Sequence, residues 1–175
     1  MPDQSPEQFA QQLRNLSKAI QENGLPIAQK MALTGKSLVQ ERIQREGLPG
    51  EQYSTNEVPT WYFNGKERNA GGRTYLEEND YGTWGDFRKA QGLQSSKVDL
   101  TYSGRMFYGL RPIKKISRGT TFEVHMGGTD KEVDEKLGWN FERYGDFLEP
   151  NAEEQKEIDE IVDDEFEKLI DKYLG

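Results

Sequence analysis

The central stretch from Lys97 to Met126 constrains the fold of this chain more than any other feature of the sequence. Its first half, KVDLTYSGRMFYGLRP, is the most apolar and aromatic run in the chain, and IKKISRGTTFEVHM follows directly. In that second half apolar and polar residues alternate around an Arg118-Gly119 turn, a pattern typical of a β-hairpin. The run 98–102 also has strand character, and Ser103 can cap a short helix after it. We therefore expect an α+β fold, in which a small antiparallel sheet with a central β-hairpin is covered by helices.

Helical patterns flank this stretch on both sides. Ser5 and Gln8 form a capping box for a first helix, which Gly24 is expected to end, and Pro26 opens a second helix that stops at Gly47. After the hairpin, a helix is expected over residues 129–145. A long amphipathic C-terminal helix begins with a second capping box at Asn151. At 175 residues the chain is expected to form a single domain over residues 1–175.

Residues 47–96 stand apart as a long aromatic-rich insertion or arm with few leucine, isoleucine or valine residues. The pair Asn64-Gly65 predicts a two-residue hairpin turn, and Thr83 with Asp86 predicts the start of a short helix. Rings scattered through a polar segment are better suited to contacting another surface than to forming a core of their own. The predicted partner anchors are five rings: Trp61, Tyr62, Phe63, Trp84 and Phe87.

Charge is distributed unevenly along the chain. Residues 149–172 hold 11 acidic and 3 basic side chains, a balance of −8 that equals the net charge of the whole chain. Basic residues gather near the hairpin: Arg105, Arg111, Lys114, Lys115 and Arg118. Both groups can be ordinary solvated surfaces, but one basic and one acidic region also suit head-to-tail association of copies. The candidate contacts are Arg105, Lys114, Lys115 and Arg118 on the basic side and Glu160, Asp163 and Asp164 on the acidic side.

Little in the sequence points to an enzyme. His125 is the only histidine and falls on the polar side of the predicted hairpin, and the chain has no cysteine, so we expect no catalytic site, metal site or cofactor. The glycine-rich pieces NAGGRTY and HMGGTDK lack the spacing of a phosphate-binding loop. No run is apolar enough to span a bilayer, and MPDQSPEQ does not resemble a signal peptide, so no membrane contact is expected.

Three segments resemble the neck and tail-completion (head-tail connector) proteins of tailed bacteriophages. They are LVQERIQREGLPG, DLTYSGRMFYGL with its hairpin, and EKLGWNFERYGDFLEPNAEEQKEIDEIVDDEFEKLI, and together the resemblance covers about residues 27–48 and 97–174. It implies a non-enzymatic α+β protomer that assembles as a ring between capsid and tail. It also implies that Leu100, Ser103, Gly104 and Met106 pack beneath the sheet, and that Gly145, Phe147 and Leu148 form the turn before the last helix. The aromatic insertion departs from this family pattern.

The resulting hypothesis is a virion structural protein, made in the host bacterial cytoplasm. It would form an oligomeric ring and dock to portal, adaptor or tail proteins. DNA would only pass through the ring lumen, where an acidic helix would repel it without reading its sequence. The alternative is a non-enzymatic ligand-binding module in which the aromatic residues of 53–87 bind a glycan or peptide.

Overall fold

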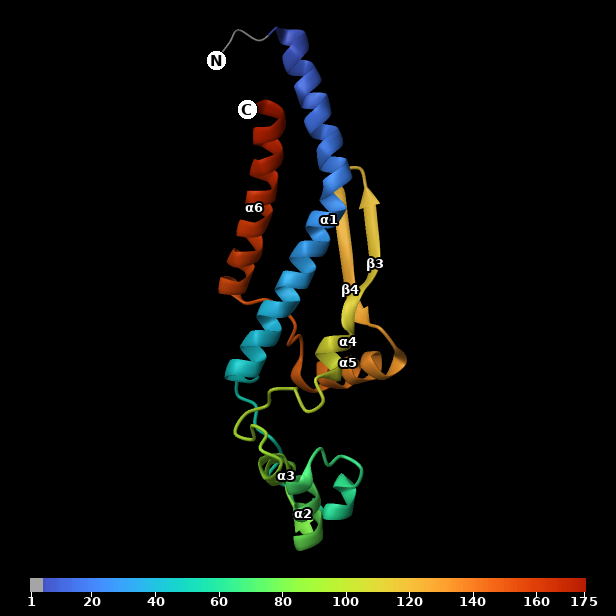
Figure 1. Cartoon of the computed structure of the whole chain (residues 1–175), viewed down its shortest axis with the longest axis vertical. Helices are drawn as coiled ribbons and strands as arrows, with labels where there is room; N and C mark the ends of the chain where they lie inside the picture. The colour runs from blue at the N-terminus through green and yellow to red at the C-terminus, as the bar shows by residue number, and fades with distance from the viewer. Residues whose placement is uncertain (1–4) are drawn as a thin grey trace. The chain divides into compact units, whose positions relative to one another are not determined.

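The computed structural model describes residues 5–175 and has the predicted mixed α+β architecture. The chain divides into two compact units (Figure 1). Unit 1 comprises the chain up to Gln40 together with Arg105–Gly175, and unit 2 comprises Glu41–Gly104. The predicted insertion, residues 47–96, lies within unit 2.

A single helix, α1 (Pro6–Glu46), replaces the two helices predicted for the N-terminal region. Its predicted start is confirmed, since the Gln8 backbone N–H donates to the Ser5 hydroxyl and the Ser5 N–H donates to the Gln8 side chain. The predicted break at Gly24 is wrong, because both Gly24 and Pro26 lie inside the helix. Figure 1 shows α1 changing direction in this region, as expected where proline removes a backbone hydrogen bond.

The hairpin lies against α1 in unit 1. After the short helix α4 (Arg105–Gly109), β3 (Leu110–Arg118) pairs antiparallel with β4 (Thr121–Gly128) through the predicted turn, where Gly119 has φ 63°. A register shift between Pro112 and Lys114 marks a β-bulge at the proline, which cannot donate to the ladder. Phe122, Val124 and Met126 are half-buried and alternate with exposed residues on β4, as predicted.

Two more helices complete unit 1. Helix α5 (Lys131–Tyr144) lies within the predicted range 129–145, and it is capped by Asp130, whose carboxylate accepts from the Val133 backbone N–H. Helix α6 (Ala152–Leu174) begins with the capping box predicted at Asn151. It runs beside α1, where Ile158 packs against Gly35 and the Lys30 ammonium lies 2.7 Å from a Glu165 carboxylate oxygen.

Unit 2 contains only short elements. They are β1 (Val58–Pro59), the 3₁₀ helix η1 (Thr60–Phe63), α2 (Ala70–Glu78), β2 (Tyr81–Gly82) and α3 (Trp84–Ala90). β1 pairs with β2, and Thr83 caps α3 as predicted. The predicted hairpin at Asn64-Gly65 is wrong, because the turn there follows a 3₁₀ helix. The run 98–102 is not a strand either, and Leu100 within it has a positive φ of 52°.

An aromatic cluster forms the core of unit 2. Phe63 and Phe87 stack with ring centroids 4.9 Å apart, and Trp84 and Tyr75 pack against Phe87 at 5.7 Å and 5.8 Å. Phe63 is 2% exposed and Phe87 is fully buried. The prediction that these two rings anchor a partner is therefore wrong for the folded unit, since the chain uses them as its own core.

Candidate functional site

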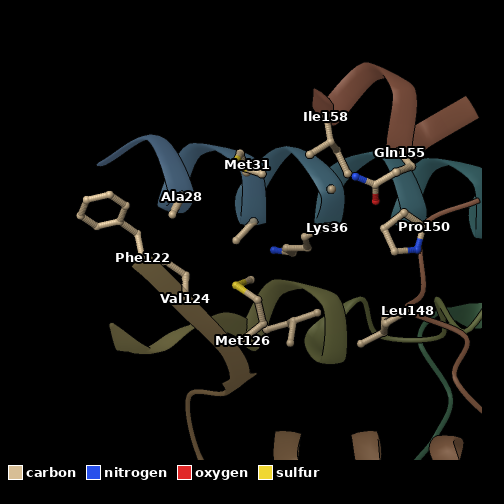
Figure 2. A pocket seen from close by; sticks show the side chains of 13 residues that line it. Ala28, Met31, Lys36, Phe122, Val124, Met126, Leu148, Pro150, Gln155 and Ile158 are labelled. Atoms are coloured by element: carbon tan, nitrogen blue, oxygen red, sulfur yellow. The ribbon is translucent and has the colours of Figure 1, made fainter. Parts of the chain in front are cut away.

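An apolar pocket of about 400 Å³ lies between α1, the hairpin and the start of α6 in unit 1. Figure 2 shows side chains from these elements converging on it. Its lining consists almost entirely of apolar side chains and small residues, together with one lysine and one glutamine: Ala28, Met31, Ala32, Gly35, Lys36, Leu110, Phe122, Val124, Met126, Leu148, Pro150, Gln155 and Ile158. We call this the apolar pocket. Two methionines among its side chains give it walls that can adapt to an occupant.

Lys36 is the charged group of the apolar pocket. Its ammonium points into the space between α1 and Met126 (Figure 2). Burial among apolar side chains lowers the pKa of Lys36 below its usual value, and the nearby Arg111 guanidinium lowers it further. No carboxylate within residues 5–175 forms an ion pair with Lys36. An apolar cavity with an uncompensated cation favours an occupant that brings both apolar groups and a negative charge.

The predicted basic residues of the hairpin fall into two classes. Lys114, Lys115 and Arg118 are exposed on β3, with no ion pair to any described residue. Lys114 lies opposite His125 and Lys115 opposite Val124, so the two lysines point to opposite faces of the hairpin.

Arg105 is different, because its guanidinium lies 3.0 Å from Glu132 and 3.4 Å from Asp130 at the start of α5. The Val133 backbone N–H, and then Arg105, hold the pKa of Asp130 below its usual range. Residues of its own chain therefore neutralise Arg105. The strongest basic candidates for a partner contact are the three residues on β3.

The predicted acidic residues lie on the exposed side of α6. Glu160 is 3.6 Å from Lys156 and Asp164 is 2.7 Å from Lys168, whereas Asp163 is exposed with no ion pair to residues 5–175. Hydrogen bonding to the Lys168 ammonium lowers the pKa of Asp164. Such exposed pairs contribute little stability. Because acidic residues far outnumber basic ones on α6, the helix still presents a large excess of negative charge.

In unit 2 the exposed rings differ from the core rings. Trp61 is 68% exposed and Tyr62 is 58% exposed, while Trp84 is half-buried against Phe63 and Phe87. Unit 2 also has a polar hollow of about 570 Å³. It is lined by Glu57, Tyr75, Asn79, Tyr81, Gly82, Asp86, Lys89 and Ala90. Of the five predicted anchors, Trp61 and Tyr62 keep the exposure that an anchor needs.

A buried ion pair in unit 2 was not anticipated from the sequence. The Arg88 guanidinium lies 3.0 Å from both carboxylate oxygens of Asp99, and the two side chains are 2% and 8% exposed. Tyr53 covers the guanidinium at 4.6 Å and donates a hydrogen bond to Asp99, and burial raises the pKa of the Tyr53 hydroxyl. Because the two buried charges compensate each other within the unit, we interpret the arrangement as structural.

The residues singled out by the family resemblance lie in both units. Met106 is buried in α4 of unit 1, whereas Leu100, Ser103 and Gly104 belong to unit 2, where Ser103 is exposed. Gly145 does make a turn before α6, with φ 68°, and the Phe147 N–H donates to its carbonyl.

Sequence reasoning also missed Lys36, although a signal was present. Ala28, Ala32 and Lys36 recur at a spacing of four on α1, which places the lysine on the apolar side of the helix. Within residues 5–175, no helix combines the length and apolarity needed to cross a bilayer, and no three acidic or histidine side chains come together as a metal-binding group. Comparison of the chain with protein-family models, with curated proteins and with solved structures gave no match.

Proposed function

We propose that this protein is a non-enzymatic structural component of a tailed-phage virion, a neck or tail-completion protein that associates with copies of itself and docks to portal or tail proteins. The observation that carries the proposal is the separation of charge within unit 1. The cations of β3 form no ion pair with a carboxylate of residues 5–175, while α6 carries most of the excess negative charge on its exposed side. Opposite charges on different surfaces of one body favour association between bodies.

The hairpin supports the same proposal. β3 and β4 form a sheet of two strands, so each strand has one edge whose backbone groups are not paired within a sheet. Such edges accept a strand from another chain readily, and proteins that remain monomeric usually protect them. The placement at a phage neck rests on the sequence resemblance over residues 27–48 and 97–174.

The self-association part is tested by sedimentation velocity at increasing salt. We expect a closed oligomer at low ionic strength that dissociates as salt screens the opposite charges. Reversing the β3 charges (Lys114→Glu, Lys115→Glu and Arg118→Glu) should abolish association, and so should Glu160→Lys with Asp163→Lys and Asp164→Lys. Mixing the two variants should restore complexes between them. Reversal of Lys18, an exposed α1 residue, serves as the control and should have no effect.

The phage assignment is tested genetically. Removing this gene from a phage genome that carries it should leave DNA-filled heads and separate tails that do not join. Normal infectious particles from the deletion would contradict the assignment while leaving self-association to be decided by sedimentation.

The hollow in unit 2 favours a second candidate, a ligand-binding module for a glycan or peptide. Tyr81 is 62% exposed at the hollow, next to carboxylates that can accept hydrogen bonds from sugar hydroxyls. A strict monomer that binds carbohydrates on an array, and loses binding on Tyr81→Ala, would favour this candidate over assembly.

A further inference from the structure

One end of unit 1 leaves apolar side chains uncovered. On α6, Ile158 packs against α1 and is 6% exposed, whereas Ile170, near the C-terminal end of the helix, is 45% exposed. The matching end of α1 behaves in the same way, with Phe9 at 49% and Leu13 at 44% exposed. Figure 1 shows these ends of α1 and α6 on the same side of the unit. Exposed aliphatic and aromatic residues grouped at the end of a helix pair favour a contact with another molecule.

The end of α6 combines this apolar surface with negative charge. Glu167, Ile170, Asp171 and Leu174 recur at spacings of three and four, so they share one face of the helix. We call these four residues the tip face. Neither Glu167 nor Asp171 forms an ion pair with a cation of the described chain, because Lys168 pairs with Asp164 and Glu165 instead. The tip face therefore offers aliphatic groups and two uncompensated carboxylates.

The apolar pocket has the opposite requirement. It is lined mainly by aliphatic and methionine side chains, and Lys36, the charged residue of this lining, has no carboxylate partner among the described residues. Arg111, the charged neighbour of Lys36, contacts the Tyr108 ring at 5.1 Å, so a second positive charge lies close by. An occupant with a carboxylate next to aliphatic groups would satisfy both the charge and the apolar walls.

We propose that the tip face of one copy of this chain docks in the apolar pocket of a second copy, with Ile170 and Leu174 against the methionines and a tip carboxylate on Lys36. This inference deepens the proposed function and rests on its self-association. The contact joins two different surfaces, so each copy has one tip to insert and one pocket to receive. Such head-to-tail contacts form a closed ring when the rotation between copies permits.

Another exposed ring suits the apolar pocket less well. Trp139 on α5 is 62% exposed, but its neighbours at helical spacing carry both signs of charge: Lys136 and Arg143 as well as Glu135 and Glu142. On α6, by contrast, carboxylates flank Ile170 at both i−3 and i+1. The charge pattern therefore favours the tip face as the occupant.

Zero-length cross-linking gives a direct test. Carbodiimide joins an amine to a carboxylate in contact with it, so the assembled protein should yield a peptide that couples Lys36 to Glu167 or Asp171. Assembly from an equal mixture of ¹⁴N and ¹⁵N protein should give this peptide with mixed labels, which proves that the link joins two copies. Lys18, exposed elsewhere on α1, should give no mixed-label link to the tip face.

Charge reversal gives a second test. Lys36→Glu, or Glu167→Lys combined with Asp171→Lys, should raise the concentration at half-association about tenfold or more. Combining the reversals in one chain should restore association. Lys36→Met replaces the reversal if Lys36→Glu fails to fold, as judged by circular dichroism.

The outcomes separate this inference from the proposed function. Oligomers that form equally well with the Lys36 variants, without the mixed-label link, overturn the inference and leave the proposed function in place. A folded wild-type chain that stays monomeric overturns both. Dodecanoate that binds the wild type tightly, loses binding on Lys36→Met and does not compete with assembly would make the apolar pocket a site for acyl carboxylates, which also overturns the inference.

Discussion

Gly24 of α1 lies directly beneath the Phe122 ring at the start of β4. A Cβ at position 24 would be 2.0 Å from Cε2 of that ring and 2.3 Å from Cζ, so only glycine admits the ring in this position. The hairpin end therefore packs onto the helix backbone itself. This contact explains why a residue that weakens helices lies in the middle of the longest helix of the chain.

The close contact predicts that Gly24→Ala has opposite effects in two backgrounds. With Phe122 present, the new methyl group displaces the ring and cancels or reverses the stabilisation of about 1 kcal/mol that alanine normally gives a helix interior. In a Phe122→Ala background, Gly24→Ala should raise the free energy of unfolding by about that amount. Urea denaturation of the four variants measures this coupling. Equal effects in both backgrounds would contradict the packing described here.

The sequence predicted correctly those helix starts and turns that are fixed by side chains a few residues away. The capping boxes at Ser5 and Asn151 and the Arg118-Gly119 turn all lie where the sequence placed them, because each depends on side chains within a few residues. Gly24 and Pro26 misled the prediction, since both are helix breakers by local preference. The packing of Phe122, which comes almost 100 residues later, is not visible in that local pattern.

Unit 2 was harder to predict for the same reason. Its core consists of rings rather than aliphatic residues, so it lacks the periodic stripe that indicates a buried face. Phe63 and Phe87 meet from separate short helices, and no spacing rule connects them. Of the candidate contacts, exposed positions such as Lys114 and Asp163 could be placed from alternation and helical spacing. Lys36 could be placed on the apolar side of α1 in the same way, but not in a pocket formed by three distant segments.

The buried pair Arg88–Asp99 should be essential to unit 2. Removing one partner leaves the other charged and buried, so Arg88→Met or Asp99→Leu should cost about 3–5 kcal/mol. The double variant should cost clearly less than the sum of the two, because it leaves no buried charge. It should not recover fully, since Asp99 also accepts from Tyr53 and from the Thr101 backbone N–H. Amide hydrogen exchange in residues 41–104 measures the stability of unit 2 in each variant. If the cost of the double variant equalled the sum of the two single costs, the ion pair would not couple the two residues.

Substitutions of a buried ring and of an exposed ring in unit 2 should have different effects, the first on stability and the second on partner binding. Phe87→Ala removes the fully buried centre of the aromatic cluster and should destabilise the unit by about 3–5 kcal/mol. Trp61→Ala removes an exposed ring and should change stability by no more than about 0.5 kcal/mol. If Trp61 anchors a partner, pull-down of portal or tail proteins should nevertheless weaken. A large stability loss from Trp61→Ala would instead assign this ring to the core.

If Lys36 favours association as proposed, it should still lower the stability of the separate chain. Below its lowered pKa, Lys36 carries its proton in both the folded and the unfolded chain, and the folded state bears the whole cost of desolvating the partly buried ammonium. Between that pKa and the ordinary lysine value of 10.5, the unfolded chain binds more protons, so this cost diminishes as pH rises. Lys36→Met should therefore raise the urea midpoint at pH 7, and the gain should shrink towards pH 10.5.

The Lys36→Met test needs a low protein concentration and a control variant. Urea midpoints are taken below the concentration of association, so that assembly does not contribute to stability. Lys18→Met, at an exposed position of the same helix, should show no such pH dependence. A residue that weakens the single chain and is needed by the assembled one indicates that its charge is retained for a contact outside the chain. Loss of stability in Lys36→Met at pH 7 would show instead that the ammonium is satisfied within its own fold.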